Sequence, residues 1–486
     1  MLSVKRDVEA FYAKCKEAAD CIRDEVGRGL EVSVTGHNDA DGLSSLGIVA
    51  GGLLDLGAKF IARSVFRREE FFETAGEHSG KLIILTDMGG GSIGELMDVF
   101  NGERLVIIDH HQPDRTEIPE GWVHVNPHLL GIDGESEVSA AGVAYLVMRN
   151  IVADAERYAP LAVVGGLGDL QDKGEKRRLV GLNESIVADA VNGMQLRVFE
   201  DFILHGRGSR PIHQALAGSQ SPYLPGLSGD EAACLSLLVD VGIEVRAGDK
   251  WRTLADLAEE EKRTLYNAIV SHLAKSNQPT EMARDLIGTV YELVNEDASS
   301  GLRDAREYSQ ILNACGKTNN SWLGVSLAMG YRGWVLKEAW RVMEQYRVTL
   351  KKGLESASKN LEQMYNIVVL RVGPDIDIRH VSSVASILSS SKIVPDDKPL
   401  VVLGQEGGIV KVSARASPSL VARGLNLGTV MREAAAKFSG RGGGHRIAAG
   451  AEIPAERLTL FLLEADRLVG EAITKAKTQV PLGGDA

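Results

Sequence analysis

The sequence predicts an α/β fold in two lobes, an N-terminal domain built on a parallel sheet and a smaller C-terminal α/β domain, joined by a helical linker. Short β-branched runs alternate with helical stretches from Leu30 to about residue 175, a pattern typical of a largely parallel sheet covered on both faces. The same alternation starts again at residue 366, after a long amphipathic helical stretch over 335–365. With 486 residues, the chain is also too long for one ordinary core.

The N-terminal lobe is expected to begin with an amphipathic helix over residues 1–28. The β-rich runs that follow each end in a polar cluster, which places four strands and the turns after them. We expect strands over 30–36, 81–86, 104–108 and 122–125, with helices over 43–56 and 138–151.

The rest of the chain is less regular. Residues 190–300 are predicted to be mostly helical, without recognisable chemistry, and a second α/β segment ends in a helix over 454–475. We therefore predict boundaries at 1–190 for the first domain, 191–310 for a mostly helical insertion, 311–365 for a motif and the connecting helix, 366–476 for the second domain, and 477–486 for a disordered tail.

Composition narrows the class of protein. Hydrophobic residues make up 44% and charged residues 25%, which is ordinary for a soluble globular chain. No apolar run approaches the roughly 20 residues of a membrane span, and the N-terminus lacks the apolar region of a signal peptide, so a cytoplasmic protein without membrane contact is expected. A net charge of −12 counts against bulk attraction to nucleic acid, but metal-binding carboxylates contribute to it and bound cations would reverse it locally.

Acidic and imidazole side chains recur just after the predicted strands, where open α/β sheets place their ligands. Carboxylates mixed with imidazoles suit Mn²⁺, Mg²⁺, Fe²⁺ or Zn²⁺ rather than Ca²⁺. Five or six such ligands suit two ions about 3.5–4 Å apart, whereas one ion needs three or four. Each cluster alone is also explained as a turn acid, but four strand ends sharing this chemistry favour a metal site. The clusters are His37, Asp39 and Asp41; Asp87; Asp109, His110 and His111; and Asp169.

A glycine-rich stretch marks the second lobe. Gly442, Gly443 and Gly444 could expose consecutive N–H groups to an anion, and Arg415, His445 and Arg446 could bind phosphates. The alternative is a tight turn that leads into a strand over 447–453.

In this order, the residues resemble the DHH phosphoesterase superfamily. His37, Asp39 and Asp41 resemble its first motif, Asp87 its second, Asp109-His110-His111 its signature and Asp169 its fourth. Residues 439–453, with Ser413-Ala414-Arg415 upstream, resemble the accompanying DHHA1 domain. Within the family, the chain is most similar to RecJ-like exonucleases of the archaeal type. Two departures stand out: Lys317 replaces the arginine of a motif over 312–317, and bacterial RecJ has aspartate where His37 stands.

The resemblance implies a DHH catalytic domain, a substrate-binding DHHA1 domain and hydrolysis of single-stranded DNA or RNA to mononucleotides by a two-metal mechanism. Two divalent cations are implied, with Mn²⁺ the expected ion and Mg²⁺ the alternative. His37, Asp39 and Asp87 would hold one ion, and Asp41, Asp87, His110 and Asp169 the other. His111 would contact the scissile phosphate and Asp109 would orient a histidine. The implied substrate contacts are His111, Asn313, Lys317, Arg415, Gly442, Gly443, Gly444, His445 and Arg446.

The expected partners are a single nucleic-acid strand, threaded between the lobes, and GINS or other replisome proteins. Two alternatives remain open: a phosphodiesterase for short oligonucleotides or cyclic dinucleotides, and a non-catalytic replisome scaffold. The long insertion counts against the first, and the retention of all four acidic motifs counts against the second.

Overall fold

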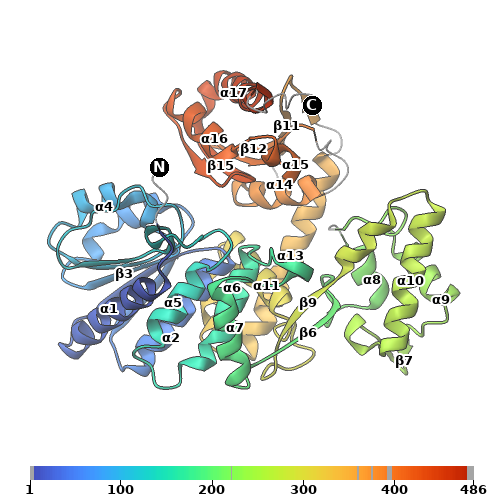
Figure 1. Cartoon of the computed structure of the whole chain (residues 1–486), viewed down its shortest axis with the longest axis horizontal. Coiled ribbons are helices and arrows are strands. Elements are labelled where there is room, and N and C mark those ends of the chain that lie inside the picture. The colour runs from blue at the N-terminus through green and yellow to red at the C-terminus, as the bar shows by residue number, and fades with distance from the viewer. Residues whose placement is uncertain (1–4, 220–221, 358–360, 374–375, 391–396, 479–486) are drawn as a thin grey trace, which may run out of the picture. The chain divides into compact units, whose positions relative to one another are not determined.

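The computed structural model describes residues 5–219, 222–357, 361–373, 376–390 and 397–478 (Figure 1). Its internal contacts divide the chain into unit 1, which comprises residues 1–219 and 225–343, and unit 2, which comprises 220–224 and 344–486. A parallel sheet in the N-terminal part and a separate C-terminal α/β domain confirm the predicted fold class.

A five-stranded parallel sheet of order β2-β1-β3-β4-β5 forms the centre of unit 1. Its side chains alternate between two faces: Leu82 and Ile84 of β3 join one apolar cluster, and Ile83 and Leu85 join another. Helices α1, α2 and α5 contribute to the first cluster, and α3 and α4 to the second. The strands are β1 (Val32–His37), β2 (Phe60–Val65), β3 (Leu82–Thr86), β4 (Arg104–Ile108) and β5 (Trp122–Val125).

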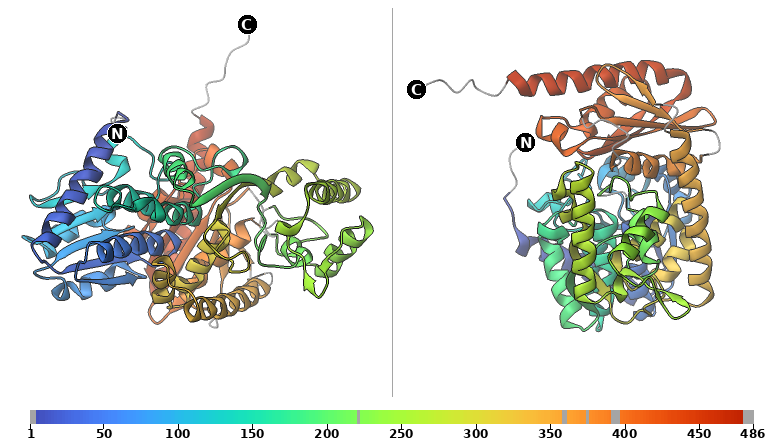
Figure 2. Two further views of the ribbon diagram at one scale, coloured as in Figure 1. Left: turned by 90° about the horizontal axis from the view of Figure 1, so that it is seen from below. Right: turned by 90° about the vertical axis from the view of Figure 1, so that its right-hand side faces the viewer.

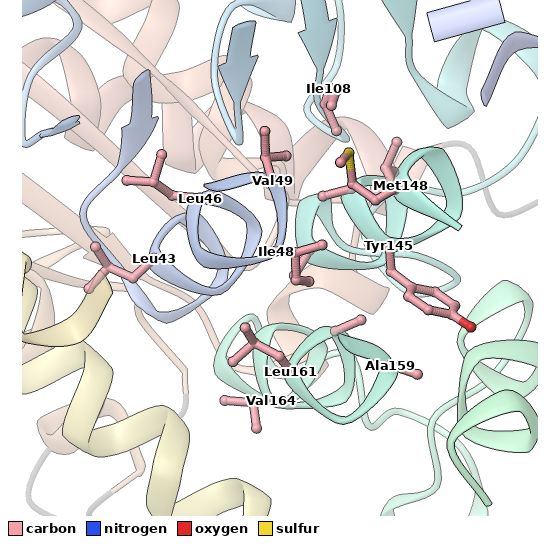
Figure 3. Close-up of a cluster of buried hydrophobic side chains, with 14 of the residues drawn as sticks. Leu43, Leu46, Ile48, Val49, Ile108, Tyr145, Met148, Ala159, Leu161 and Val164 are labelled. Atoms are coloured by element: carbon pink, nitrogen blue, oxygen red, sulfur yellow. The ribbon is translucent and has the colours of Figure 1, made fainter. Parts of the chain in front are cut away.

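Helix α2 is the central helix of this unit, and its residues from Ala40 to Leu53 are all buried. Apolar side chains of α2, α5 and α6 belong to one cluster. Figure 3 shows Leu46 and Ile48 of α2, Tyr145 and Met148 of α5, and Leu161 and Val164 of α6. Gly52 allows α5 to approach closely, because a Cβ atom there would lie 2.2 Å from Cε of Met148. The helices are α1 (Val8–Gly27), α2 (Ala40–Asp55), α3 (Arg68–Glu73), α4 (Ile93–Val99), α5 (Ala140–Met148), α6 (Ala159–Gly168) and α7 (Leu182–Asn192).

The edge strand β2 is absent from the predicted strands. Its side chains alternate between half-buried and exposed positions, so it lacks the continuous apolar run that marks the inner strands. The sheet therefore has five strands where the sequence predicted four.

Two antiparallel strands, β6 and β9, lead from the core of unit 1 to a group of helices formed by α8, α9 and α10 (Figures 1 and 2). The prediction of a mostly helical segment missed both strands, because each mixes charged with apolar residues. The elements are β6 (Leu196–Phe202), α8 (Ile212–Ala217), α9 (Glu231–Asp240), β7 (Arg246–Ala247), β8 (Lys250–Trp251), α10 (Glu259–Lys275) and β9 (Ile287–Leu293).

Three helices complete unit 1 and lead out of it. Helix α11 packs on α2 and α6, and α12 packs on α2. The predicted connecting helix is α13, which ends at Ala357, before the short strand β10. The bounds are α11 (Ala305–Lys317), α12 (Ser321–Ala328) and α13 (Trp334–Ala357).

Unit 2 contains a six-stranded mixed sheet of order β10-β11-β12-β13-β15-β14. One face packs on α16 and α17, and the other on α14. The strands are β10 (Leu361–Gln363), β11 (Val368–Arg371), β12 (Leu400–Glu406), β13 (Ile409–Arg415), β14 (Arg441–Gly444) and β15 (Ala448–Pro454), and the helices are α14 (Val381–Ser390), α15 (Pro418–Ala422), α16 (Leu427–Ala436) and α17 (Leu458–Thr478).

Residues 477 and 478 of the predicted disordered tail belong to α17, and the remainder of the tail lies outside the described residues. Among the described helices, none combines the length and the apolar character that crossing a bilayer requires.

Candidate metal centre

The loop between β1 and α2 positions the first two carboxylates. Asp39 is the N-cap of α2, and its Oδ1 accepts a hydrogen bond from the N–H of Gly42 over 3.0 Å. Gly42 is required because a Cβ atom there would lie 2.3 Å from the carbonyl oxygen of His37. Asp41 follows in the first turn of α2 and is buried.

The Asp41 carboxylate lies at the N-terminus of α5. Its two oxygens accept hydrogen bonds from the N–H groups of Ala140, over 2.7 Å, and Ala141, over 3.0 Å. A helix N-terminus favours negative charge, so these contacts fix the carboxylate and favour its ionised form. The Oδ2 atom also lies 3.7 Å from Nε2 of His110.

Asp87 follows β3 in a left-handed backbone conformation, with φ of +57°. Non-glycine residues adopt this conformation rarely, and where they do it is often at functional sites. The carboxylate is buried, and its Oδ1 has no hydrogen-bond partner among the described residues.

His110 faces three carboxylates with one nitrogen. Its Nδ1 lies 2.7 Å from the carbonyl oxygen of Gly134 and donates a hydrogen bond to it, which directs Nε2 toward the acids. Nε2 lies 3.4 Å from Oδ1 of Asp87 and 3.8 Å from Oδ2 of Asp169, and it is buried without a hydrogen-bond partner in the described part of the chain. A buried imidazole nitrogen opposite a buried carboxylate oxygen, neither hydrogen-bonded, is the arrangement that a bound cation satisfies.

Asp169 is the C-cap of α6, and its side chain accepts a hydrogen bond from a neighbour that the sequence analysis missed. The side-chain amide of Gln171, which is fully buried, donates to Oδ2 of Asp169 over 3.3 Å and to the carbonyl oxygen of Gly134 over 2.8 Å. The same carbonyl accepts from His110, so Gln171 positions two of the predicted ligands together. The only sequence signal for Gln171 is its place two residues after Asp169.

His37 and Asp39 form a second group with Asp87. Nδ1 of His37 lies 2.8 Å from Oδ2 of Asp39 and 3.7 Å from Oδ2 of Asp87. The structure therefore brings the predicted metal residues into overlapping groups whose ligand atoms lie within 4.8 Å of one another: His37, Asp39 and Asp87; Asp41, His110 and Asp169; and Asp87, His110 and His111.

The Asp109 carboxylate accepts hydrogen bonds from the residues around it. One oxygen accepts from the N–H of Gly90 over 2.7 Å, and the other accepts from the N–H of His110 over 2.8 Å and from Nδ1 of His111 over 2.9 Å. Gly90 makes this possible, since a Cβ atom there would lie 2.8 Å from Oδ2 of Asp109. Asp109 therefore orients His111, whose side chain is 45% exposed.

The closely spaced acids shift the pKa values of the carboxyl and imidazole groups in this cluster. Burial and the charge of Asp87 raise the pKa of Asp41 to about 8. Burial alone would lower the pKa of His37, but Asp39 and Asp87 raise it to about 10. Burial likewise opposes the charged form of His111, yet Asp109 raises its pKa to about 9.

These residues fit a pair of divalent cations. Without cations, protons on His37, His110 and Asp41 stabilise the cluster of acids. Bound cations would replace those protons. The donors are carboxylate oxygens and imidazole nitrogens, with no thiolate, which suits Mn²⁺ or Mg²⁺.

The motif over 312–317 is hydrogen-bonded to the loop between β1 and α2, which we call the metal loop. Oδ1 of Asn313 accepts a hydrogen bond from the N–H of Ala40 over 2.9 Å, and the carbonyl oxygen of Gly316 accepts one from the side chain of Asn38. Burial opposes the charged form of Asp39, but His37 and, to a smaller extent, the positive charge of Lys317 hold the pKa of its carboxyl below the ordinary range. Asn313 and Lys317 thus lie beside the metal loop, and their contact with substrate stays a prediction.

The predicted substrate residues of unit 2 lie on β13 and around β14. Arg415 donates to Oγ of Ser386 and to backbone oxygens, has no acidic partner among the described residues, and is sufficiently buried that its pKa falls to about 10. A half-buried guanidinium without a carboxylate partner is suited to binding an anion. Arg446 is exposed, and His445 lies in the turn between β14 and β15.

The glycine-rich segment differs from the prediction. Residues 441–444 form the edge strand β14, so successive N–H groups point in opposite directions and the expected loop with a concave anion nest is wrong. Cβ atoms at Gly442 and Gly444 would collide with the backbone of Met431 and Ala449, whereas one at Gly443 would meet nothing within 4 Å. Packing therefore explains two of the three glycines.

Sequence profiles of three domains match the chain in order: the DHH family N-terminal domain over residues 31–165, the DHH-CID domain over 204–287 and the DHHA1 domain over 364–471. Uncharacterized protein MJ0831 of Methanocaldococcus jannaschii is 30% identical over 450 residues, which are 91% of this chain and 94% of that protein. The single-stranded-DNA-specific exonuclease RecJ of Thermus thermophilus is 31% identical over 188 residues, 36% of this chain and 27% of that enzyme.

Two solved structures share the fold. RecJ from Thermus thermophilus in complex with Mn²⁺ has a TM-score of 0.59 at 19% identity, covering 94% of this chain and 55% of that one. CDC45 from Entamoeba histolytica has a TM-score of 0.64 at 13% identity, covering 94% of this chain and 99% of that one. The order of the three domains, the relative similar over nearly its whole length and the RecJ match confirm the resemblance seen in the motifs, and the chain belongs to the DHH superfamily as a RecJ-like member.

Proposed function

We propose that this chain is a metal-dependent exonuclease that hydrolyses single-stranded DNA or RNA to mononucleotides. Membership of the DHH family supports the coarser part of this statement, a metal-dependent phosphoesterase. The choice of a single strand as substrate, the release of mononucleotides and a role in DNA replication or repair are parts of the proposal.

One observation carries the proposal: Nε2 of His110 and Oδ1 of Asp87 face each other across 3.4 Å, buried and without hydrogen-bond partners in the described structure, among three further carboxylates. Such a cluster is costly to bury without cations. Bound divalent cations would lower the pKa of water and neutralise charge on a phosphodiester.

The chain's own residues supply the remaining chemistry. Asp41, Asp87, His110 and Asp169 would hold one cation, and His37, Asp39 and Asp87 the other, with Mn²⁺ the expected ion and Mg²⁺ the alternative. His111, fixed by Asp109 and protonated at neutral pH, would donate a hydrogen bond to a phosphate oxygen at the exposed side of the cluster. This bond would strengthen as charge develops on the phosphate.

Arg415 favours a polymeric substrate, because it is a half-buried cation in the separate C-terminal domain with no acidic partner among the residues described. Together with Gly443, His445 and Arg446, it would bind phosphates away from the bond that is cut. A dinucleotide needs no such second site, which favours longer strands. Binding to GINS or other replisome proteins stays a proposal that rests on the sequence resemblance.

The test uses DNA and RNA 30-mers labelled at the 5′ or the 3′ end, each with Mn²⁺, Mg²⁺ or a chelator. We expect cation-dependent release of mononucleotides from single strands, and little from a duplex or from a dinucleotide. Asp87→Asn should be inactive, whereas Asp98→Asn, which changes an exposed acid on α4, should keep wild-type activity. A wild-type protein that binds Mn²⁺ but cleaves only dinucleotides would overturn the exonuclease assignment, and one that binds no cation would favour a scaffold.

A further inference from the structure

Leu170 is an unusual residue beside the metal cluster. Its φ is +56°, in the left-handed region that leucine rarely adopts, and its side chain is 63% exposed. Leu170 follows the C-cap of α6, a position where helices often end in this conformation, and its apolar side chain lies in solvent. Strain of this kind persists where the surroundings enforce it, and it often marks a functional site.

The surroundings of Leu170 do enforce it. On one side, Asp169 is the C-cap of α6 and accepts a hydrogen bond from Gln171. On the other side, the buried Gln171 is fixed by bonds to Gly134 and Asn183, and its own N–H donates to the carbonyl oxygen of Gly166 over 2.9 Å. With both neighbours held inward, the Leu170 side chain is held in solvent.

Leu170 also borders the accessible side of the cluster. The side chains of Asp41, Asp87 and His110 are at most 3% exposed, whereas those of Asp169 and His111 are 32% and 45% exposed. The side chains of His37 and Asp39 are also 34% exposed, so a substrate approaches the cluster through these four exposed residues. The Cα atom of Leu170 lies one peptide unit, about 3.8 Å, from that of Asp169.

We propose that Leu170 packs against the nucleobase of the nucleotide whose phosphodiester is cut. This inference rests on the proposed function and adds a determinant of substrate class to it. Phosphates and sugars are polar, so the face of a base is the apolar surface that a strand can offer to a leucine. A base at a strand end has one face without a stacking neighbour, and contact with that face is tolerant of sequence. Leu170 would thus favour nucleotides over other phosphodiesters.

The test compares Leu170→Gly with Met194→Gly. Both residues have positive φ and exposed apolar side chains, but Met194, with φ of +55° and 80% exposure, lies in the turn between α7 and β6. Glycine relieves the backbone strain at either position, so neither variant should melt below the wild-type protein. Leu170→Gly should lower kcat/KM for a single-stranded 15-mer about ten-fold, mainly through KM, while Met194→Gly should not.

A second substrate identifies the contact as one with a base. The same 15-mer with abasic residues at both ends should be cut by the wild-type protein about as slowly as the intact strand is cut by Leu170→Gly, and the variant should cut both strands alike. Leu170→Gly cutting the intact strand at the wild-type rate would overturn the inference while leaving the proposed function in place. The inference would also be overturned if Leu170→Gly, relative to the wild-type protein, slowed cleavage of the abasic strand as much as that of the intact strand. A smaller rise in the variant's melting temperature with Mn²⁺ would overturn it too, because the role of Leu170 would then be to support Asp169. Failure of the wild-type protein to cut the intact strand would instead reject the proposed function, and this inference with it.

Discussion

Asn313 accepts a hydrogen bond from the backbone N–H of Ala40 over 2.9 Å, and so ties α11 to the start of α2, 273 residues earlier in the chain. A second bond beside it runs from the side chain of Asn38 to the carbonyl oxygen of Gly316. The loop that carries Asp39 and Asp41 is therefore held in place by a helix from the far end of unit 1.

The acceptor role of Asn313 can be separated from a role in binding substrate. Asn313→Ala leaves the N–H of Ala40 without its partner, at a cost of about 1–3 kcal/mol, and should reduce both Mn²⁺ affinity and turnover. Asn313→Asp keeps an acceptor oxygen and should retain more activity than Asn313→Ala. If Asn313 instead touches phosphate, the added negative charge would make Asn313→Asp the worse variant, which steady-state kinetics on a single strand would reveal.

Gly316 should tolerate no side chain. A Cβ atom there would lie 1.5 Å from the carbonyl oxygen of Asn38, so Gly316→Ala must displace the metal loop or α11. We expect a loss of about 3 kcal/mol or more in the free energy of unfolding, together with loss of activity. Gly27→Ala is the control, because a Cβ atom at Gly27 meets nothing within 4 Å and its melting temperature should match that of the wild-type protein.

Mn²⁺ should stabilise the wild-type protein and not Asp87→Asn. A cation at one hundred times its dissociation constant adds about 2.7 kcal/mol of stability. Asp87→Asn removes a carboxylate from both predicted ligand groups and should abolish most of this increase. In chelator, the same variant should melt at or above the wild-type temperature, because it relieves repulsion with Asp41 and asparagine tolerates a positive φ. Thermal melts with and without Mn²⁺ measure both effects, and an unchanged Mn²⁺ shift would contradict the ligand assignment.

In chelator, stability should fall as the pH rises. The folded protein raises the pKa of His37 from an ordinary value of 6.5 to about 10, and that of Asp41 from 3.8 to about 8. The proton held by each group stabilises the folded protein at a pH below the ordinary pKa of that group. This stabilisation is lost as the pH rises through the raised pKa of the folded protein. Melting temperatures should therefore decline between pH 6.5 and pH 10, while Mn²⁺ affinity rises over the same range because cations displace these protons. His37→Gln should flatten the decline, and a wild-type curve that rises through this range would contradict the assigned protonation.

A substitution in unit 2 should weaken the binding of long strands more than the binding of cations. Arg415→Lys keeps the charge but loses the planar donor array, so we expect weaker binding of a 30-mer, with a dissociation constant raised about ten-fold. The rise in melting temperature with Mn²⁺ should stay that of the wild-type protein. Equal losses of strand binding and cation binding would contradict a separate substrate role for this domain.

Much of unit 1 could be predicted because its signals are local. Buried strands such as Leu82–Thr86 appear as apolar runs, and the acids that follow them mark the carboxyl edge of the sheet. The edge strand β2 and the strands β6 and β9 carry charged residues among apolar ones, so their pattern is weak. The prediction of a loop at Gly442 was wrong: the residue lies in a strand, and its lack of a side chain lets α16 pack on β14. Contact of these glycines with phosphate stays a prediction.

The sequence by itself determined the family, the α/β fold in two domains and the residue types of the candidate metal cluster, since periodicity and motif spacing are properties of neighbouring residues. Only the tertiary structure decided that Gln171 fixes both His110 and Asp169, that Asn313 braces the loop before α2, and that Leu170 is held in solvent with a positive φ. These relationships depend on which backbone groups meet across long separations and on the conformation of single peptide units, and neither is written in the order of the residues.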